Sequence, residues 1–465
     1  MSRDVPTRLW AWSALGLAGA LITALAAPRA LADGVVGWWY DPGVPGGHPV
    51  ATVLVWAIPL VLAPPLFSRD VYSYLAQGAI LHLGRDPYDR APAVLASLHH
   101  GHLLAAVSPF WRHTTAPYGP LFVALVSLIV GICGSHLIAG VLVCRVLDLA
   151  GLWLLVVHVP RVAHALGADE GRAVWLAAAS PLVLLGLLAA AHNDLLMAGL
   201  LVAGVSVALR GNPLLGVAVC ALAATIKLPA LAGAVFIAVC WARTETRPAA
   251  ALRLLGTAAA ITVAVLAAVT LAAGVGVGWM STSVFSTPAK VRLAITPATA
   301  VAHTLAGLLH DAGVSASAGG LESAFGVAAA AIAACVGLGL LARARVPTLT
   351  ALLGAALVLA AVGGPAAWPW YLSWGLVLLC ACPGPQRSPA LLAPLTLGAF
   401  LVRPDGTLVL PLGAAPAVLA VEVVLAIAAW ARWGRSHPGP GGDPPGVGAA
   451  GRGERPPVSS ALART

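Results

Sequence analysis

The chain has 465 residues, of which 60% are hydrophobic and only 9% are charged. This composition excludes a soluble fold, because the polar side chains are too few to cover a globular surface of this size, and it excludes a disordered chain, which needs low hydrophobicity. Stretches such as residues 346–386 contain no charged residue. We therefore expect an all-α, polytopic integral membrane protein.

The formal net charge of +9 is informative about membrane topology, through the positions of the basic residues. Basic tracts of the kind that bind nucleic acid are absent, and the arginines stand singly or in pairs at the ends of apolar runs. This distribution is typical of cytoplasmic loops under the positive-inside rule. We expect a lipid bilayer as a partner, and no nucleic acid.

Hydropathy predicts about 13 transmembrane helices. The apolar segments are, in chain order, 9–27, 50–66, 119–133, 137–159, 173–190, 195–209, 213–226, 229–241, 254–273, 323–342, 347–362, 366–382, 390–402 and 408–430. The segment 119–133 is excluded from the count and is expected to be interfacial or half-inserted. It is short, it begins with a helix-initiating proline at Pro120, and it is interrupted by Gly131 and Gly134.

These segments divide the chain into six regions. They are N-terminal membrane helices (1–66), a first external loop with an interfacial helix (67–135), a transmembrane module (136–273), a second external loop (274–322), C-terminal transmembrane helices (323–432) and a disordered cytoplasmic tail (433–465). The arginine-rich loops 243–253, 343–345 and 432–435 are expected to be cytoplasmic. Counting spans from them places the turns 192–194, 363–371 and 403–406, and also Lys227, at the outer face.

The first external loop opens with the most informative residues, from Ser68 to Gly78. A carboxylate at a membrane boundary beside aromatic hydroxyls suits a general base, so Asp70 is the candidate catalytic residue, with Arg69, Tyr72 and Tyr74 beside it. An interfacial belt of anchoring aromatic and charged residues explains the same pattern equally well.

Five motifs carry a resemblance to a known family. They are Arg-Asp-Val-Tyr-Ser-Tyr at 69–74, Gly-x-Asp-Pro-Tyr at 84–88, Ala-Pro-Tyr-Gly-Pro-Leu at 116–121, His-Asn-Asp at 192–194 and Lys-Leu-Pro at 227–229. In order and spacing they resemble the multi-spanning GT-C glycosyltransferases that use polyprenyl-phosphate sugars. Within these, residues 68–374 are most similar to the actinobacterial polyprenol-phosphomannose-dependent α-1,6-mannosyltransferases, some of which are labelled carotenoid-biosynthesis-associated membrane proteins.

The resemblance implies a reaction and its partners. The family's catalytic base, the acidic residue that opens the first external loop, corresponds to Asp70. The donor is expected to be polyprenyl-phosphate mannose, and the acceptor a mannoside or lipid-linked glycan such as lipomannan. Transfer would invert the anomeric centre and form an α-1,6 linkage on the extracytoplasmic face of the cytoplasmic membrane. The leaving phosphate is already an anion, so positive charge is needed more than a general acid.

Further polar and aromatic residues are candidates for substrate binding. Lys227, Lys290 and Arg292 are expected to bind the phosphate, although snorkelling for Lys227 and solvation for the two loop residues are the alternatives. The turn 192–194 is expected to orient the acceptor or help to hold a metal ion, or else to cap a helix. The complete substrate-binding set is Arg69, Tyr72, Tyr74, Asp86, Tyr88, Tyr118, His192, Asn193, Asp194, Lys227, Lys290, Arg292, Trp370 and Tyr371.

No cofactor is assigned, and a divalent metal ion is left open. The histidines at 99, 100 and 102, with His82 and His113 nearby, are of the right ligand type, but their spacing matches no specific metal motif and a solvated external helix is favoured. Arg145 and Asp148 lie one turn apart in one apolar segment and are expected to neutralise each other.

Two other functions remain open from the residues alone. A transporter or flippase of a lipid or sugar should show internal repeats and charges in mid-span, whereas no repeat is visible and the notable polar residues gather at one face. A non-catalytic envelope assembly protein would need no base at all.

Overall fold

The computed structural model describes residues 49–134, 136–281, 293, 295–364 and 366–436. Every regular element in these ranges is helical, which confirms the predicted all-α class. The predicted segment 9–27, the phosphate-binding candidates Lys290 and Arg292, and the tail from 437 onward lie outside the described residues.

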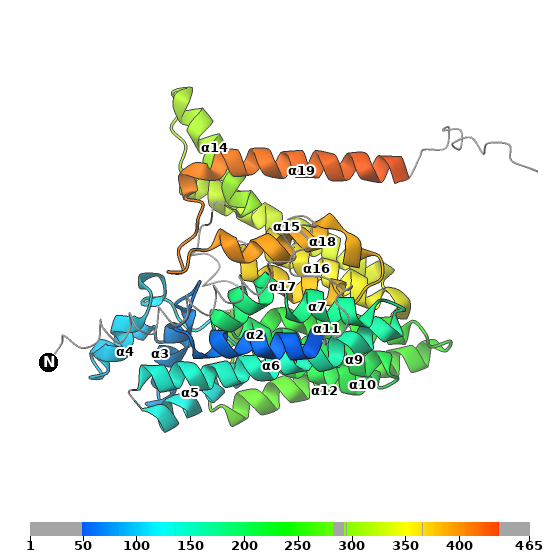
Figure 1. The fold of residues 1–465 in the computed structure, drawn as a ribbon, viewed down its shortest axis with the longest axis horizontal. Coiled ribbons are helices and arrows are strands. Elements are labelled where there is room, and N and C mark those ends of the chain that lie inside the picture. Colours follow the sequence, from blue (N-terminus) through cyan, green and yellow to red (C-terminus); the bar gives the residue numbers. More distant parts are fainter. Residues whose placement is uncertain (1–48, 135, 282–292, 294, 365, 437–465) are drawn as a thin grey trace, which may run out of the picture. The chain divides into compact units, whose positions relative to one another are not determined.

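The chain divides into two units, Met1–Val418 and Leu419–Thr465. The first unit holds the site, and Figure 1 traces its helices in chain order. Its longer helices are α2 (Pro49–Leu62), α3 (Asp70–His82), α5 (Pro120–Cys133), α6 (Leu137–Ala165), α7 (Glu170–Ala178), α9 (Asp194–Leu209), α10 (Pro213–Ala224), α11 (Leu231–Ala242), α12 (Pro248–Ala272), α14 (Pro297–Asp311), α15 (Ala318–Arg343), α16 (Leu349–Gly363) and α18 (Pro389–Leu397). Short helices between them are η2 (Pro92–Ala96), α4 (Gly101–Ala106), η3 (Pro109–Trp111), α8 (Pro181–Val183), η4 (Leu184–Ala189), η5 (Leu228–Ala230), α13 (Gly278–Ser281), η9 (Pro369–Leu372) and α17 (Ser373–Leu379). Helix α19 (Ala415–Ser436) passes from the first unit into the second.

Five helical stretches in the described ranges are long and apolar enough to cross a membrane, and they mark the chain as a membrane protein. They are Leu137–Ala165, Glu170–Ala189, Pro248–Ala272, Ala318–Arg343 and Val346–Gly363. Eight shorter apolar helices have 10–17 residues. At about 1.5 Å per residue, a 12-residue helix such as α10 covers roughly 18 Å, less than the roughly 30 Å of a hydrocarbon core. Several predicted spans are thus too short to cross unaided.

The turn 192–194 of the candidate site lies beside the midpoint of α6, the longest helix in the described ranges. A Cβ added to Gly151, the middle residue of the 29-residue α6, would lie 2.4 Å from the carbonyl oxygen of Leu195. The start of α9 therefore packs against the midpoint of α6, roughly 20 Å from the Leu137 end. The turn 192–194 therefore lies beside the middle of α6 and not beside its Leu137 end.

Helices α3 and α5 occupy the space along the first half of α6. Leu75 of α3 contacts Gly140, and Val126 of α5 lies so close to Gly78 that a Cβ there would be 2.7 Å away. Nine of the 13 residues of α3 are buried. Part of the predicted first external loop is therefore a buried helix, while α5, with 14 residues, has a length that suits an incomplete crossing.

The predicted second external loop is also helical over much of its described part. It contains α13 and α14, and α15 already begins at Ala318 instead of near residue 323. Thr296, just before α14, accepts a hydrogen bond through Oγ1 from the backbone N–H of Ala367 at 3.2 Å. This bond connects the segment to the aromatic residues that begin at Trp368.

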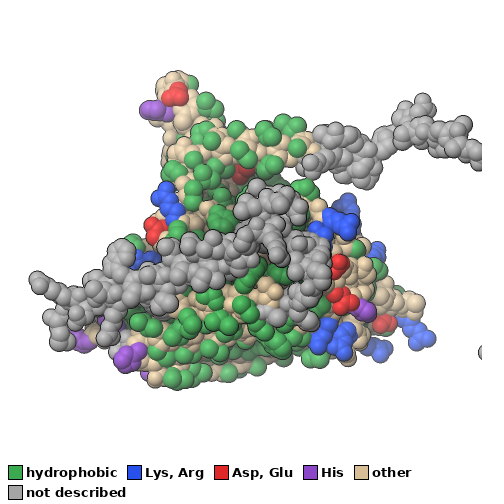
Figure 2. All heavy atoms as spheres, viewed as in Figure 1, with side chains coloured by type: hydrophobic (Ala, Val, Ile, Leu, Met, Phe, Trp, Pro, Cys, Tyr) green, Lys and Arg blue, Asp and Glu red, His purple; other side chains and the backbone are tan. Residues whose placement is uncertain are grey.

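Apolar and basic side chains lie on different parts of the visible surface of the first unit. Below the grey band in Figure 2 the visible face is mostly hydrophobic, and many of the visible Lys and Arg side chains lie toward the right of the view. Apolar side chains such as Leu128, Val146 and Val263 are exposed along α5, α6 and α12. This pattern is that of a protein whose flank faces lipid.

Candidate active site

Asp70 is the first residue of α3, and its two carboxylate oxygens have different surroundings. The indole Nε1–H of Trp111 donates to Oδ1 at 2.7 Å. Oδ2 lies 3.7 Å from Nε2 of His192, which is beyond hydrogen-bond distance, and the Asp70 side chain is 14% exposed. One oxygen is therefore held by an indole, whereas the other is available to accept a proton from a ligand.

The chain approaches Asp70 through an unusual backbone conformation. Phe67 has a φ of 65°, in the left-handed region, and its N–H donates to the carbonyl of Pro404 at 3.0 Å. The backbone of Ser68 also lies against Gly406, which has a φ of 87°. The structure thus brings the turn 403–406 next to Asp70, and non-glycine residues with positive φ cluster at functional sites.

The turn 192–194 is the second part of the site, and it too follows a left-handed residue, Ala191, with a φ of 56°. The His192 ring is fully buried and lies 4.2 Å from the Trp370 ring, centroid to centroid. Burial lowers the pKa of His192, although the carboxylates of Asp70 and Asp194 oppose this effect. The imidazole is therefore uncharged at neutral pH.

Asn193 is buried, and neither its amide nitrogen nor its amide oxygen has a hydrogen-bond partner in the described structure. It occupies the N-cap position of α9, as the helix-cap alternative expects, but its side chain makes no capping hydrogen bond. Unpaired buried amide groups are costly, and a polar ligand would satisfy them.

Asp194 and Lys227 form a buried ion pair. Nζ of Lys227 lies 2.8 Å from Oδ1 and 3.0 Å from Oδ2 of Asp194, and the indole of Trp374 donates to Oδ1 at 2.5 Å. Nζ also lies 4.2 Å from the centroid of the Tyr371 ring and 6.0 Å from that of Tyr118. The charge of Lys227 is therefore balanced by Asp194 within an aromatic cage.

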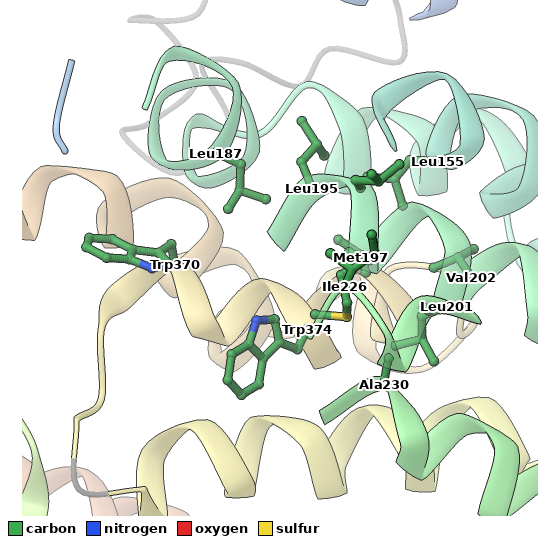
Figure 3. Close-up of a cluster of buried hydrophobic side chains, with 14 of the residues drawn as sticks. Leu155, Leu187, Leu195, Met197, Leu201, Val202, Ile226, Ala230, Trp370 and Trp374 are labelled. Carbon is green, nitrogen blue, oxygen red and sulfur yellow. The ribbon is translucent and has the colours of Figure 1, made fainter. Parts of the chain in front are cut away.

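Apolar packing holds this pair in place. Figure 3 shows Trp374 close to Met197 and Ile226, and Trp370 farther along the same segment in the direction of Leu187. All five side chains belong to the buried core. The close packing keeps water away from the ion pair, which strengthens its electrostatic attraction.

Residues of the segment 86–88 support Tyr118. The hydroxyl of Tyr88 donates to the carbonyl of Tyr118 at 3.0 Å, and Asp86 accepts from the N–H of Tyr88 at 2.8 Å within its own turn. The ring of Tyr74 packs edge-on against Tyr118 with centroids 4.9 Å apart. Burial raises the pKa of both Tyr74 and Tyr118, so their hydroxyls stay neutral. Asp86 thus supports a neighbouring turn and makes no direct contact with Asp70 or Asp194.

Gly119 joins the Tyr118 segment to the segment that bears Lys227. Its N–H donates to the carbonyl of Ile226 at 2.9 Å, and the N–H of Leu121 donates to the carbonyl of Thr225 at 3.0 Å. A Cβ on Gly119 would lie 2.2 Å from the Thr225 carbonyl oxygen, which is too close for any side chain. Only glycine allows these two segments to meet.

We expect Gly119→Ala to separate the two segments and to lower both thermal stability and activity. The clash involves backbone atoms, so we expect a loss of about 2 kcal/mol or more of stability, measured as a fall in the unfolding midpoint of the purified protein. Gly101→Ala is the matched control, because a Cβ there would meet nothing within 4 Å. Equal midpoints for the two variants would contradict the proposed clash.

Arg145 has different partners from those expected. The side chain is fully buried, and its guanidinium donates to the carbonyls of Val61 and Ala189 at 2.7 and 2.8 Å and also to that of Ala63. No ion pair with Asp148 forms, and Oδ2 of Asp148 has no partner in the described structure. The guanidinium instead donates to carbonyls at the C-terminal ends of α2 and η4, so Arg145 and Asp148 face each other as charges without a direct hydrogen bond.

The structure brings most of the predicted site residues together. Grouped around Asp70 and the Asp194–Lys227 pair are Tyr74, Tyr118, His192, Trp370 and Tyr371, with Asn193 in the same turn. Arg69 and the partly buried Tyr72 lie beside Asp70 in the chain. Asp86 and Tyr88 stand behind Tyr118. In the described part of the chain, no group of three or more His, Cys, Asp or Glu residues could hold a metal ion.

Two tryptophans of the site, Trp111 and Trp374, were not identified from the sequence, and the hydrogen-bond partners of Arg145 were not foreseen. Trp374 follows Tyr371 by three positions, so helical spacing was a signal that could have placed it beside that ring. Trp111 is 41 positions from Asp70, and no local pattern connects them.

The fold and the site define a polytopic membrane protein with a carboxylate poised for acid–base chemistry beside a buried, aromatic-lined ion pair. The sequence profile of the alpha-(1→6)-mannopyranosyltransferase N-terminal domain matches residues 7–243. Alpha-(1→6)-mannopyranosyltransferase A of Mycobacterium tuberculosis is 34% identical over 77% of this chain and 70% of its own length. A probable alpha-(1→6)-mannopyranosyltransferase of Mycolicibacterium smegmatis is 35% identical over 71% of this chain and 64% of its own length.

A second alpha-(1→6)-mannopyranosyltransferase of M. tuberculosis is 33% identical over 80% of this chain and 73% of its own length. The chain therefore belongs to the alpha-(1→6)-mannopyranosyltransferase family, which confirms the predicted resemblance, and it is a glycosyltransferase. No solved structure shows significant similarity to it, so the GT-C fold assignment stays a prediction.

Proposed function

We propose that the protein transfers mannose from polyprenyl-phosphate mannose to the 6-hydroxyl of a mannoside acceptor, such as the growing chain of a lipid-linked mannan of the lipomannan type. The relatives' names support the sugar and the linkage. The observation that carries the proposal is the Asp70 carboxylate, with Oδ1 held by Trp111 and Oδ2 available near the turn 192–194.

The reaction is a single displacement. Oδ2 of Asp70 takes the proton from the acceptor hydroxyl as its oxygen attacks the anomeric carbon, and the bond from that carbon to the phosphate oxygen breaks. The electron pair leaves with polyprenyl phosphate, so a β-linked donor gives an α-linked product. The Trp111 indole keeps the carboxylate in one orientation throughout.

The surrounding residues suit a sugar substrate. Trp370 and Tyr371 are packed among other rings and help to form an aromatic wall, and Asn193 offers an unpaired donor and an unpaired acceptor for hydroxyl groups. A flippase or a non-catalytic assembly protein would not need a carboxylate held in this way. The enzyme is therefore favoured over both alternatives.

The proposal places the reaction on the extracytoplasmic side of the cytoplasmic membrane. Arg210 and Arg243 lie just after the C-terminal ends of α9 and α11, and the positive-inside rule assigns that end to the cytoplasm. Asp70 begins α3, and the turn 192–194 immediately precedes α9, so both lie toward the opposite ends of these helices. A lipid-linked donor would reach them from the outer leaflet.

The test is a transfer assay on the purified protein in lipid. Polyprenyl-phosphate mannose, glucose and arabinose are offered with a short α-1,6-linked mannoside acceptor, and the product's linkage and anomeric configuration are determined by NMR. We expect transfer from the mannose donor alone, with an α-1,6 product. Movement of the donor across a vesicle membrane without any transfer would instead identify a flippase.

A further inference from the structure

The two buried cations of the inner site, Lys227 and Arg145, are already engaged by groups of the protein. Lys227 is paired with Asp194, and the guanidinium of Arg145 is held by backbone carbonyls. The carboxylates of Asp70 and Asp194 lie at the same site. A donor phosphodiester would add another negative charge, so the cations that meet it must lie elsewhere.

Two arginines donate to carbonyls at the end of the short helix α4. Nη2 of Arg69 donates to the carbonyl of Ala106 at 2.7 Å, and Nε of Arg112 donates to the carbonyl of Val107 at 3.2 Å. Ala106 is the last residue of α4 and Val107 is its C-cap. Consecutive residues at the end of α4 thus each accept a hydrogen bond from one guanidinium group.

The same two arginines flank the catalytic carboxylate. Arg69 precedes Asp70 in the chain, Arg112 follows Trp111, and Asp70 and Trp111 are joined by the 2.7 Å hydrogen bond. Arg69 is exposed and Arg112 is half-buried. A guanidinium has five N–H donors, and the described structure engages one on each arginine. The remaining donors are available to a ligand next to Asp70.

We propose that Arg69 and Arg112 form a phosphodiester-binding site that receives the phosphate of the polyprenyl-linked donor. The proposal rests on the proposed function, and it assigns the phosphate to a position beside Asp70 instead of to Lys227. Planar guanidinium groups match phosphate oxygens in pairs, and a phosphate bound there would lie beside the base that activates the acceptor.

The experiment measures equilibrium binding of radiolabelled polyprenyl phosphate, without a sugar, to the full chain in phosphatidylcholine nanodiscs. We expect Arg69→Gln and Arg112→Gln each to weaken binding about tenfold, because each removes charge-assisted hydrogen bonds. Arg85→Gln and Arg90→Gln are matched controls, since both arginines are exposed in the same loop. Unchanged binding by the Arg69 and Arg112 variants would overturn the site.

Lysine variants keep the test valid if a glutamine variant folds poorly. Arg69→Lys and Arg112→Lys retain the charge but lose the planar fork, so we expect a loss of about threefold with an unchanged thermal midpoint. Wild-type affinity in both lysine variants, together with wild-type affinity in any folded glutamine variant, would show that neither arginine holds the phosphate.

Two further measurements are needed. One distinguishes polyprenyl phosphate from other phosphate-bearing lipids, and the other distinguishes the phosphate site from the proposed function. Phosphatidylglycerol added to the nanodiscs should displace polyprenyl phosphate only weakly, and displacement at equal mole fractions would overturn the assignment to the donor. Arginine-dependent binding without mannosyl transfer would leave the phosphate site standing while the proposed function fails. Mannosyl transfer together with binding that does not depend on the two arginines would support the proposed function and overturn the phosphate site.

Discussion

Asp70→Asn should reduce mannosyl transfer about a thousandfold while leaving the protein folded. The amide keeps an oxygen that can accept the Trp111 indole N–H, so the side chain stays in place, but it cannot take the proton from the acceptor hydroxyl. We therefore expect a large fall in kcat and little change in the KM for the donor. Initial rates with a labelled donor, measured over a range of acceptor concentrations, check this expectation.

Two variants serve as comparisons for Asp70→Asn. Asp89→Asn removes an exposed carboxylate from the same loop and should retain wild-type rates. Asp70→Glu keeps a base but moves it by about one bond length, and a misplacement on the order of 1 Å costs roughly a hundredfold in rate. If Asp70→Asn kept a tenth or more of the wild-type rate, Asp70 would not be the base.

Arg145→Met should be the most destabilising single change in the transmembrane body. The substitution leaves the carbonyls of Val61, Ala63 and Ala189 without their donor in a fully buried place. At about 1–3 kcal/mol for each unsatisfied buried group, we expect a loss of about 3 kcal/mol or more. The two helix ends lead directly to Asp70 and to the turn 192–194, so activity should fall along with stability.

The matched control for Arg145→Met is Arg161→Met, because Arg161 is an exposed arginine on the same helix α6. Its removal should shift the thermal unfolding midpoint little. Arg145→Lys should fall between the two, since one ammonium group cannot reach both helix ends as a guanidinium does. Wild-type midpoints for Arg145→Met would show that the three carbonyls find other donors.

Much of the candidate site was predictable because its residues stand in motifs at the ends of apolar segments. Asp70, His192, Asp194, Lys227 and Tyr371 were each marked by polarity where the flanking sequence is apolar, and the structure brings them together. Their pairing was less predictable. The partner of Lys227 is 33 positions away, and no local pattern distinguishes a buried ion pair from a free phosphate-binding lysine.

The burial of helix α3 was also not predicted from the sequence. Hydropathy divides a chain into apolar and polar segments, and it assigned residues 67–117 to an external loop. In the structure, α3 is a largely buried helix, because its residues beyond Asp70 pack against α5 and the first half of α6. Whether a mildly polar segment is buried depends on the helices beside it, which hydropathy does not register.

The sequence by itself determined the helical membrane class, the family and the candidate base, because partition into a bilayer depends on local composition and because motifs retain their order along the chain. Only the tertiary structure decided which charges are free to act. Arg145 is held by carbonyls, Lys227 by Asp194, and Arg69 and Arg112 keep donors to spare. Charge pairing depends on distances between atoms, and residues far apart in the chain become neighbours only when the helices pack.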